Sequence, residues 1–432
     1  MSKELSSPKE YRTGSGASIY ILIICTLLWM VNWMDRQVLS AVLEPMKADL
    51  RLNDGDMGII GTVFLVSIAI LSFPAAYLID RWSRRKTLGI MALLWSLFTF
   101  LTGKAWNFWT VLIPRSLVGV GEAGYSAGGS AMIAAAYSSK ARGVVLGIFN
   151  MGIPLGVALG SLLGGILAKQ YGWQAPFLFF AIPGIILAIM AFFMKDYKTV
   201  HQINEQGGKV TFGKSIATIF KIPTLVWVAV GYGITNIMTM SFMFWAPAFI
   251  GRAWSVDVAA ANSALVPIVL LAIVGSPSGG ILADVWFRKN PRGRFYIPAI
   301  ATIGGALAII GAIYFQFKGA AGTSLWILFG LLNAMALPAV SAATQDVAPV
   351  AQKGLAWGIM VACGYFLGGA WSPYLVGAIS NSLGQDAQAL GTALSIAAAL
   401  GGILGGLCFL MASRPYPMDM EKVKLEQVLA EK

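Results

Sequence analysis

Long apolar stretches separated by short polar segments recur along the whole chain. The first six lie at roughly 18–44, 57–79, 87–103, 108–137, 143–168 and 175–194. Six more lie at roughly 223–250, 262–283, 296–315, 323–345, 356–380 and 389–412. A membrane-spanning helix needs about 20 predominantly apolar residues, so each stretch can cross a bilayer. The pattern predicts an all-α membrane protein with twelve transmembrane helices.

A polar interval from Lys195 to Ile222 divides the twelve stretches into two sets of six. The predicted organisation is an N-terminal six-helix bundle over 1–194, a cytoplasmic linker over 195–222, a C-terminal six-helix bundle over 223–412 and a cytoplasmic tail over 413–432. The apolar residues of the linker predict an amphipathic helix on the inner face of the membrane. These residues are Phe212, Ile216, Ile219 and Phe220. The polar tail is expected to be mobile.

Composition excludes several protein classes. Apolar residues make up 57% of the 432 residues and charged residues 12%, about half the charged fraction of an ordinary soluble domain. Intrinsic disorder, a disulfide-stabilised secreted scaffold and an ordinary cytosolic enzyme are therefore excluded. The net charge of +12 does not indicate nucleic-acid binding, because the basic residues are spread through short loops.

The distribution of basic residues predicts the orientation of the chain in the membrane. With the N-terminus inside, 23 of the 31 lysines and arginines fall in inner segments and six in outer loops, while Arg36 and Arg115 lie within spans. Such a bias favours cytoplasmic placement of both termini. No Asn-x-Ser/Thr sequon occurs and no outer loop is long, which favours a bacterial plasma (inner) membrane. We expect a multi-pass monomer whose first helix is retained.

Catalytic and metal chemistry have little support in the sequence. The three cysteines, Cys25, Cys363 and Cys408, lie in separate apolar runs, and His201 is the sole histidine. No pattern of His, Cys or paired carboxylates indicates a metal, a cofactor or an enzyme active site. A nucleotide-binding loop is also absent, which argues against ATP-driven pumping.

The two halves carry a repeated loop. Ala76-x-x-x-Asp80 follows the second span and Gly280-x-x-x-Asp284 follows the eighth, and basic residues come directly after each. The two units are 204 residues apart, at the same place in each half. Internal repeats of this kind are typical of secondary transporters and favour alternating access over a channel.

This repeated small-xxx-Asp loop with its following arginines resembles the signature loop of the major facilitator superfamily, over essentially the whole chain. The first copy departs from the family pattern, because Ala76 and Ser83 replace the usual glycines. Two further runs are similar to the Spinster-like group of that superfamily: Asn32-Trp-Met-Asp-Arg36 and Arg115-Ser-Leu-Val-Gly-Val-Gly-Glu122. The anion:cation symporter group is the near rival. The resemblance implies two pseudo-symmetric bundles around a central cavity lined by helices 1, 4, 7 and 10.

Four ionisable residues within predicted spans are candidates for function, since charges in the bilayer interior are costly and mostly functional. These residues are Asp35, Arg36, Arg115 and Glu122. An arginine fork suits a carboxylate, and a carboxylate in a low-dielectric cavity holds a proton more readily than in water. We therefore expect Arg36, Arg115 and the neighbouring Asn32 to bind substrate, and Glu122 with Asp35 to carry a proton. The alternative is that Asp35–Arg115 and Arg36–Glu122 pairs merely hold the bundle together.

The seventh and tenth spans carry no charge, in contrast to the first and fourth. We expect charge and coupling in the first half and apolar and aromatic substrate contacts in the second. The substrate-contact candidates there are Tyr232, Asn236, Trp357 and Tyr365. Packing or interfacial anchoring is the alternative for each aromatic residue.

The repeated loops are predicted to gate the transporter. Asp80 with Arg84 in the first half, and Asp284 with Arg288 in the second, can pair in one state and separate in another. Taken together, the sequence predicts a secondary active transporter for a small organic anion, a carboxylate or sugar acid, coupled to protons. The alternative is a carrier of lysolipids and other amphipathic molecules, or a proton-driven drug exporter. The direction of transport is left open.

Overall fold

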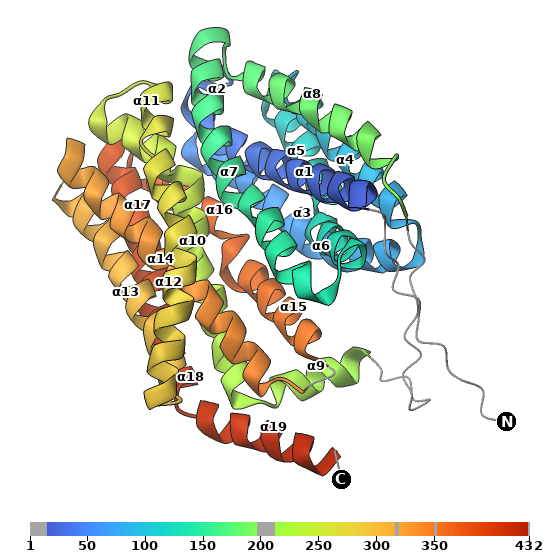
Figure 1. The fold of residues 1–432 in the computed structure, drawn as a ribbon. Helices are drawn as coiled ribbons and strands as arrows, with labels where there is room; N and C mark the ends of the chain where they lie inside the picture. Colours follow the sequence, from blue (N-terminus) through green and yellow to red (C-terminus); the bar gives the residue numbers. More distant parts are fainter. Residues whose placement is uncertain (1–14, 197–211, 316–318, 350–351, 431–432) are drawn as a thin grey trace.

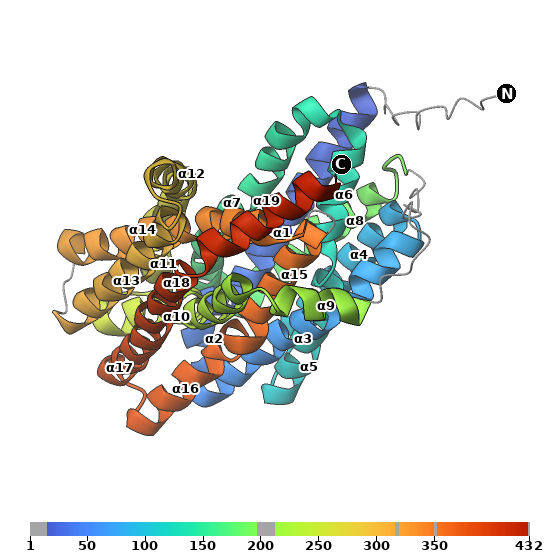
Figure 2. The same ribbon diagram turned by 90° about the horizontal axis from the view of Figure 1, so that it is seen from below.

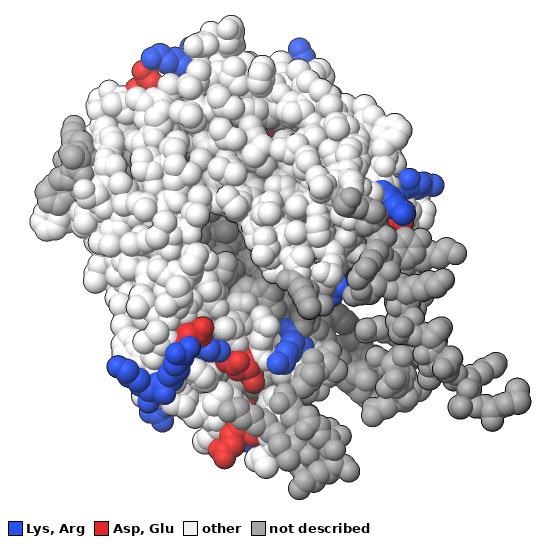
Figure 3. Space-filling model, viewed as in Figure 1, with Lys and Arg blue, Asp and Glu red and all other residues white. Residues whose placement is uncertain are grey.

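The fold is built from helices alone over the residues that the computed structural model describes, which are 15–196, 212–315, 319–349 and 352–430. Ten helical stretches in these ranges are long and apolar enough to cross a membrane. The all-α membrane architecture is therefore confirmed, and the number of twelve spans stays a prediction. Figure 3 shows the charged side chains toward the two ends of the molecule, with an uncharged belt between them.

The helices fall into two groups, one from each half of the chain (Figure 1). The first group comprises α1 (Ser15–Ala41), α2 (Leu43–Asp49), α3 (Asp54–Arg81), α4 (Arg84–Thr102), α5 (Phe108–Glu122), α6 (Tyr125–Ala136), α7 (Ser139–Tyr171) and α8 (Gln174–Ala191). The second group comprises α10 (Pro223–Trp254), α11 (Val258–Ser263), α12 (Val266–Lys289), α13 (Gly293–Tyr314), α14 (Gly319–Val347), α15 (Lys353–Gly364), α16 (Ser372–Leu383), α17 (Ala387–Ala398) and α18 (Gly405–Ala412).

Several predicted spans are interrupted in the structure, and three of them are interrupted away from their ends. The fourth is divided into α5 and α6 by a turn at Ala123 and Gly124, directly after Glu122. The eleventh and twelfth each contain a π-helical turn, η2 (Tyr365–Gly369) and η3 (Ala399–Leu404). Hydropathy cannot detect such breaks, because the interrupting residues are as apolar as the rest. π-Helical turns are frequently found at functional sites.

Glycines bring particular helices into backbone contact within each half. A Cβ at Gly156 of α7 would lie 2.4 Å from the carbonyl oxygen of Met30 in α1. In the second half, a Cβ at Gly279 of α12 would lie 2.2 Å from the carbonyl oxygen of Met335 in α14. Small residues four apart permit this approach. Most of the glycines of the fifth predicted span, 143–168, are therefore explained by the packing of α7 on α1.

Two short helices lie outside the bundles, at the end that the charge bias assigns to the cytoplasm (Figures 1 and 2). α9 (Phe212–Phe220) precedes α10 and buries Ile219, whereas Phe220 is exposed. α19 (Tyr416–Ala430) occupies most of the predicted tail. Its Tyr416 hydroxyl donates to Asp346 at 2.5 Å, and Asp419 accepts from Thr224. The expectation of a mobile tail is wrong for α19, because these bonds dock it on the second half.

The two halves meet at the predicted outer end. There α3 lies against α16, and the end of α7 lies against α11. Figure 3 shows a hollow between the halves below this closed region. The arrangement has the form of a cavity that is covered on the predicted outer side.

Candidate functional site

The first helix presents Asn32 and Arg36 to the middle of the N-terminal half, where they meet Glu122 of α5. Arg36 Nε donates to Asn32 Oδ1 at 3.0 Å, and the same nitrogen lies 2.8 Å from Glu122 Oε2. The Asn32 and Glu122 side chains are buried, and that of Arg36 is 12% exposed. Asn32 and Arg36 lie on one face because they are one helical turn apart.

A second ion pair lies beside the first. Arg115 Nη1 is 3.2 Å from Asp35 Oδ1, and the Thr99 hydroxyl donates to Asp35 Oδ2. Arg115 is completely buried, and among the residues that the structure describes its Nε and Nη2 have no hydrogen-bond partner. Its guanidinium carbon lies 4.7 Å from the centre of the Phe64 ring, which stabilises the cation. The structure thus contains both pairs of the structural alternative, with unused donors on Arg115.

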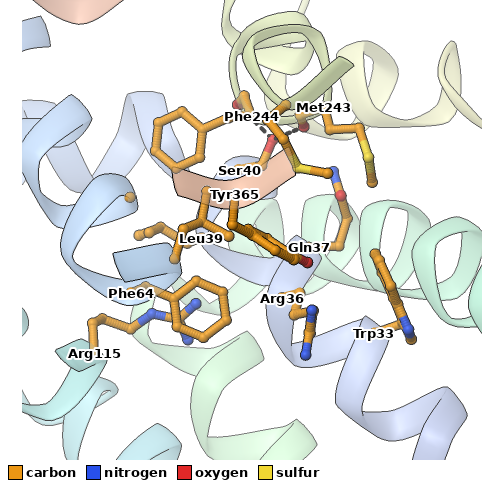
Figure 4. Close-up of a pocket in the computed structure, with 13 residues that line it drawn as sticks. Trp33, Arg36, Gln37, Leu39, Ser40, Phe64, Arg115, Met243, Phe244 and Tyr365 are labelled. Atoms are coloured by element: carbon orange, nitrogen blue, oxygen red, sulfur yellow. Dashed lines mark hydrogen bonds between the residues drawn. The ribbon is translucent and has the colours of Figure 1, made fainter. Parts of the chain in front are cut away.

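A small cavity lies between the halves next to these pairs (Figure 4). Its N-terminal wall comes from α1, α3 and α5, and its C-terminal wall from α10 and η2. The lining residues are Trp33, Arg36, Gln37, Leu39, Ser40, Gly61, Phe64, Leu65, Arg115, Met240, Met243, Phe244 and Tyr365. One wall therefore carries both arginines, and the other is largely apolar.

The predicted substrate-contact residues of the second half lie in two places. Tyr365 lines the cavity, at the start of the π-helical turn η2. Tyr232, Asn236 and Trp357 are not among its lining residues. Asn236 instead donates to the Tyr232 carbonyl at 2.7 Å, and the Tyr232 and Trp357 rings are 6.0 Å apart. These three form a neighbouring cluster within the second half.

Several lining residues were not predicted from the sequence. Trp33, Gln37 and Ser40 follow the helical spacing of Arg36, so an i, i+3, i+4 pattern through that arginine was an available signal. Phe64, Met243 and Phe244 offered none, because they are apolar residues in apolar helices. The contact of Phe64 with both guanidiniums, at 4.7 Å for Arg115 and 6.0 Å for Arg36, depends on tertiary packing.

The predicted gating residues are placed in part. Asp284 accepts from Arg294 at 2.5 Å, and Arg294 also bonds Asp346 at 2.5 Å. Arg288, the expected partner of Asp284, is exposed in the last turn of α12. Arg84 is half-buried at the start of α4. The Asp80 side chain lies outside the described residues.

This geometry agrees with a family comparison. The sequence pattern of the Major Facilitator Superfamily matches residues 25–373. The chain belongs to the major facilitator superfamily. Members of this superfamily are membrane transporters with two helical bundles, as the sequence predicted. The expected superfamily is therefore confirmed.

Relatives of this major facilitator protein come from animals and from bacteria. Protein spinster homolog 1 of Bos taurus is 26% identical over 432 residues, covering 92% of this chain and 80% of that protein. The hexuronate transporter of Bacillus subtilis is 27% identical over 277 residues, covering 63% and 66% of the two chains. The expected likeness to the Spinster group is therefore confirmed.

A solved structure agrees with the fold. It is a bacterial homolog of the human lysosomal transporter Spinster, in an inward-facing and unoccupied conformation. The TM-score is 0.84 at 19% identity, covering 94% of this chain and 99% of that one. A D-xylose–proton symporter matches with a TM-score of 0.69 at 15% identity, covering 90% and 97% of the two chains. Likeness at these identities concerns the fold alone.

Proposed function

We propose that this major facilitator protein is a secondary active transporter that moves a small organic anion across the membrane by alternating access, coupled to protons. The observation that carries the proposal is Arg115. It is completely buried beside the central cavity, and two of its three nitrogens have no hydrogen-bond partner. Buried donors without partners are costly, and a carboxylate accepts from two nitrogens of one guanidinium.

The second arginine supports the same assignment. Arg36 lines the cavity, and its guanidinium carbon is 4.8 Å from the Trp33 ring centre. Its Nε is occupied by Asn32. Two cations on one wall give an electrostatic reason for selecting an anion, and the neighbouring carboxylates Asp35 and Glu122 compete for them when the cavity is empty.

Glu122 is the proposed proton carrier, with Asp35 as its helper. Both Glu122 oxygens are buried without a hydrogen-bond donor, although Oε2 is in ionic contact with Arg36. Asp35 differs, because it accepts from Thr99 and Arg115. Protonation of Glu122 therefore weakens its contact with Arg36, which releases that arginine for a substrate anion.

The residues of the C-terminal wall indicate the chemical character of the uncharged part of the substrate. Met240, Met243 and Phe244 supply apolar surface. Of the polar groups that line the cavity, the Ser40 hydroxyl on the N-terminal wall is already engaged by the Met243 and Phe244 carbonyls, at 3.0 and 2.7 Å. A sugar acid has several hydroxyls that need partners, and Gln37 and Tyr365 are the remaining neutral polar side chains of the lining. The indole N–H of Trp33 adds one further donor. So small a number of polar groups favours a carboxylate with an apolar body over a sugar acid, and it supports the amphipathic carrier as the second candidate.

The proposed setting is a bacterial plasma (inner) membrane, with a monomeric chain and both termini in the cytoplasm. The distribution of basic residues supports this orientation.

Substrate class is tested by thermal stability of the purified protein, because a ligand that binds the native state stabilises it. Three probes separate the candidates: glucuronate, phenylacetate and lysophosphatidylglycerol. We expect phenylacetate to raise the melting temperature most, and the Arg115→Lys variant to lose the shift. Stabilisation by uncharged analogues alone, such as phenylethanol, would contradict an anion site.

A further inference from the structure

A buried acidic residue lies at the predicted outer end, far from the central ion pairs. Asp54 begins α3, and its side chain is 0% exposed. Its carboxylate accepts from Lys47 at 2.6 Å and from the Ser380 hydroxyl at 2.6 Å. Arg252 adds two bonds at 2.7 Å, one to each oxygen. Such a bidentate pair is the strongest geometry that an arginine and a carboxylate adopt.

The bonds to Asp54 connect the two halves of the chain. Asp54 and Lys47 belong to the first half, whereas Arg252 at the end of α10 and Ser380 in α16 belong to the second. The Asp54 amide also donates to the side chain of Gln385 at 3.1 Å. Arg252 bonds Glu44 as well, at 2.5 Å. We call the set of Glu44, Lys47, Asp54, Arg252 and Ser380 the Asp54 cluster.

The Asp54 cluster lies on the outer side of the central cavity. In α10, Met240 and Phe244 line the cavity, and Arg252 is eight residues beyond Phe244, or about 12 Å along a helix. In α3, Phe64 and Gly61 line the cavity, and Asp54 is seven residues before Gly61, or about 10 Å. Both α10 and α3 therefore extend from the cavity to the Asp54 cluster, although their chains run in opposite directions.

The layer between cavity and cluster is closed by tight contacts. Ser40 donates to the carbonyls of Met243 and Phe244, which joins α1 to α10. A Cβ at Gly61 would lie 2.6 Å from the Phe244 ring, so the ring fits flat against α3. A Cβ at Gly377 would lie 2.3 Å from the Asp54 carbonyl. This layer forms the roof of the cavity seen in Figure 4, where Ser40 and Phe244 lie at its upper edge.

We propose that the Asp54 cluster is the outer lock of this transporter. Opening the cavity toward the outer side requires α3 to separate from α10 and α16, which breaks every bond between Asp54 and the second half. The strength of the cluster therefore sets how much of the substrate-free protein is closed on the outer side. The proposal rests on alternating access, but not on the substrate or on proton coupling.

The test measures the opening directly in protein without substrate or gradient. Spin labels are attached in a cysteine-free background at Tyr171→Cys and Ser382→Cys, two exposed positions at the outer ends of α7 and α16. Distances are measured by double electron–electron resonance. We expect one short population in the otherwise unchanged protein. Asp54→Asn and Arg252→Gln should each enlarge a longer population at least threefold, and Ser380→Ala should enlarge it less.

Asp257→Asn is the matched control. Lys169 and Asp257 also join the two halves at the outer end, at 2.7 Å, but both are about half exposed, and exposed pairs contribute little. This variant should keep the short population. The lock is overturned if Asp54→Asn and Arg252→Gln keep that population while lowering the melting temperature, which would make the cluster a structural brace. It is equally overturned if Asp257→Asn opens the protein as much as Asp54→Asn. If Asp54→Asn and Arg252→Gln fail to fold, the spin-label distances measured in Ser380→Ala provide the test instead.

Discussion

Arg36 and Glu122 are in ionic contact without sharing a hydrogen bond. Arg36 Nε lies 2.8 Å from Glu122 Oε2, but its single hydrogen is directed at Asn32 Oδ1. The attraction between the two side chains is therefore mainly Coulombic and weakens when Glu122 is neutral. This relationship gives Glu122 a means of controlling the arginine that faces the cavity.

Glu122→Gln should separate exchange from accumulation. The glutamine is isosteric and cannot take up or release a proton, so counterflow of substrate in proteoliposomes should continue. Uptake driven by a pH gradient should fall at least tenfold. Asp35→Asn is the comparison variant. We expect it to impair both counterflow and gradient-driven uptake, because it leaves the buried Arg115 without its carboxylate partner. Concentrative uptake by Glu122→Gln would assign coupling to another group.

Arg115→Lys should weaken anion binding without loss of charge. A lysine ammonium is a point charge and cannot bond both oxygens of a carboxylate in the fixed geometry of a guanidinium. We expect the dissociation constant for an anionic substrate to rise at least tenfold, or about 1.4 kcal/mol, in equilibrium binding by scintillation proximity. Lys104→Ala, an exposed substitution outside the cavity, is the control. Unchanged affinity in Arg115→Lys would exclude Arg115 from the anion site.

The orientation of the chain can be tested by cysteine labelling in cells. A cysteine at exposed Ser263 in α11 should react with a membrane-impermeant maleimide added outside. One at exposed Lys289, the last residue of α12, should react only after the membrane is permeabilised. Labelling of Lys289→Cys in intact cells would reverse the predicted topology.

Tyr416→Phe should loosen α19 from the second half. Removing the hydroxyl leaves Asp346 with one donor fewer, a loss of roughly 1–3 kcal/mol for a bond to a charged group. Amide hydrogen exchange in α19 should accelerate, while exchange in α10 stays slow. Tyr374→Phe, in exposed α16 surface, is the matched control. Equal protection of α19 in both variants would mean that Asp419 alone docks the helix.

The docking of α19 should be independent of pH across the neutral range and weaken only in strongly alkaline solution. Burial, followed by the hydrogen bond to Asp346, holds the pKa of Tyr416 above its ordinary value. A group whose pKa is raised in the folded state contributes stability that is fully present below the unfolded value, about 10 for tyrosine, and lost as the pH rises through the raised value. The difference in exchange between Tyr416→Phe and the unchanged protein should therefore persist unchanged from pH 7 to 9.

The sequence revealed the central charges because an arginine or carboxylate interrupts an apolar run. Arg36, Arg115 and Glu122 could thus be identified without a structure. Met243 and Phe64 could not, since an apolar lining residue looks like any lipid-facing or core residue. Asp54 was missed for a different reason: it lies just before a predicted span, where charged residues are ordinarily solvated. Its importance comes from Arg252, which is 198 residues away in the sequence.

The close contact of α7 with α1 determines how the anion site moves. Gly156 leaves no room for the two helices to slide past each other, because the Met30 carbonyl already occupies the space of a side chain. α7 also contacts α11 at the outer end. It therefore connects the interface between the halves to α1, the helix that carries Arg36. The ion pairs Arg36–Glu122 and Asp35–Arg115 join α1 to α5, so we expect a tilt of the first half to carry these four side chains as one unit. In the proposed transport cycle the anion keeps its arginine ligands, and what changes is the side of the membrane from which water reaches it.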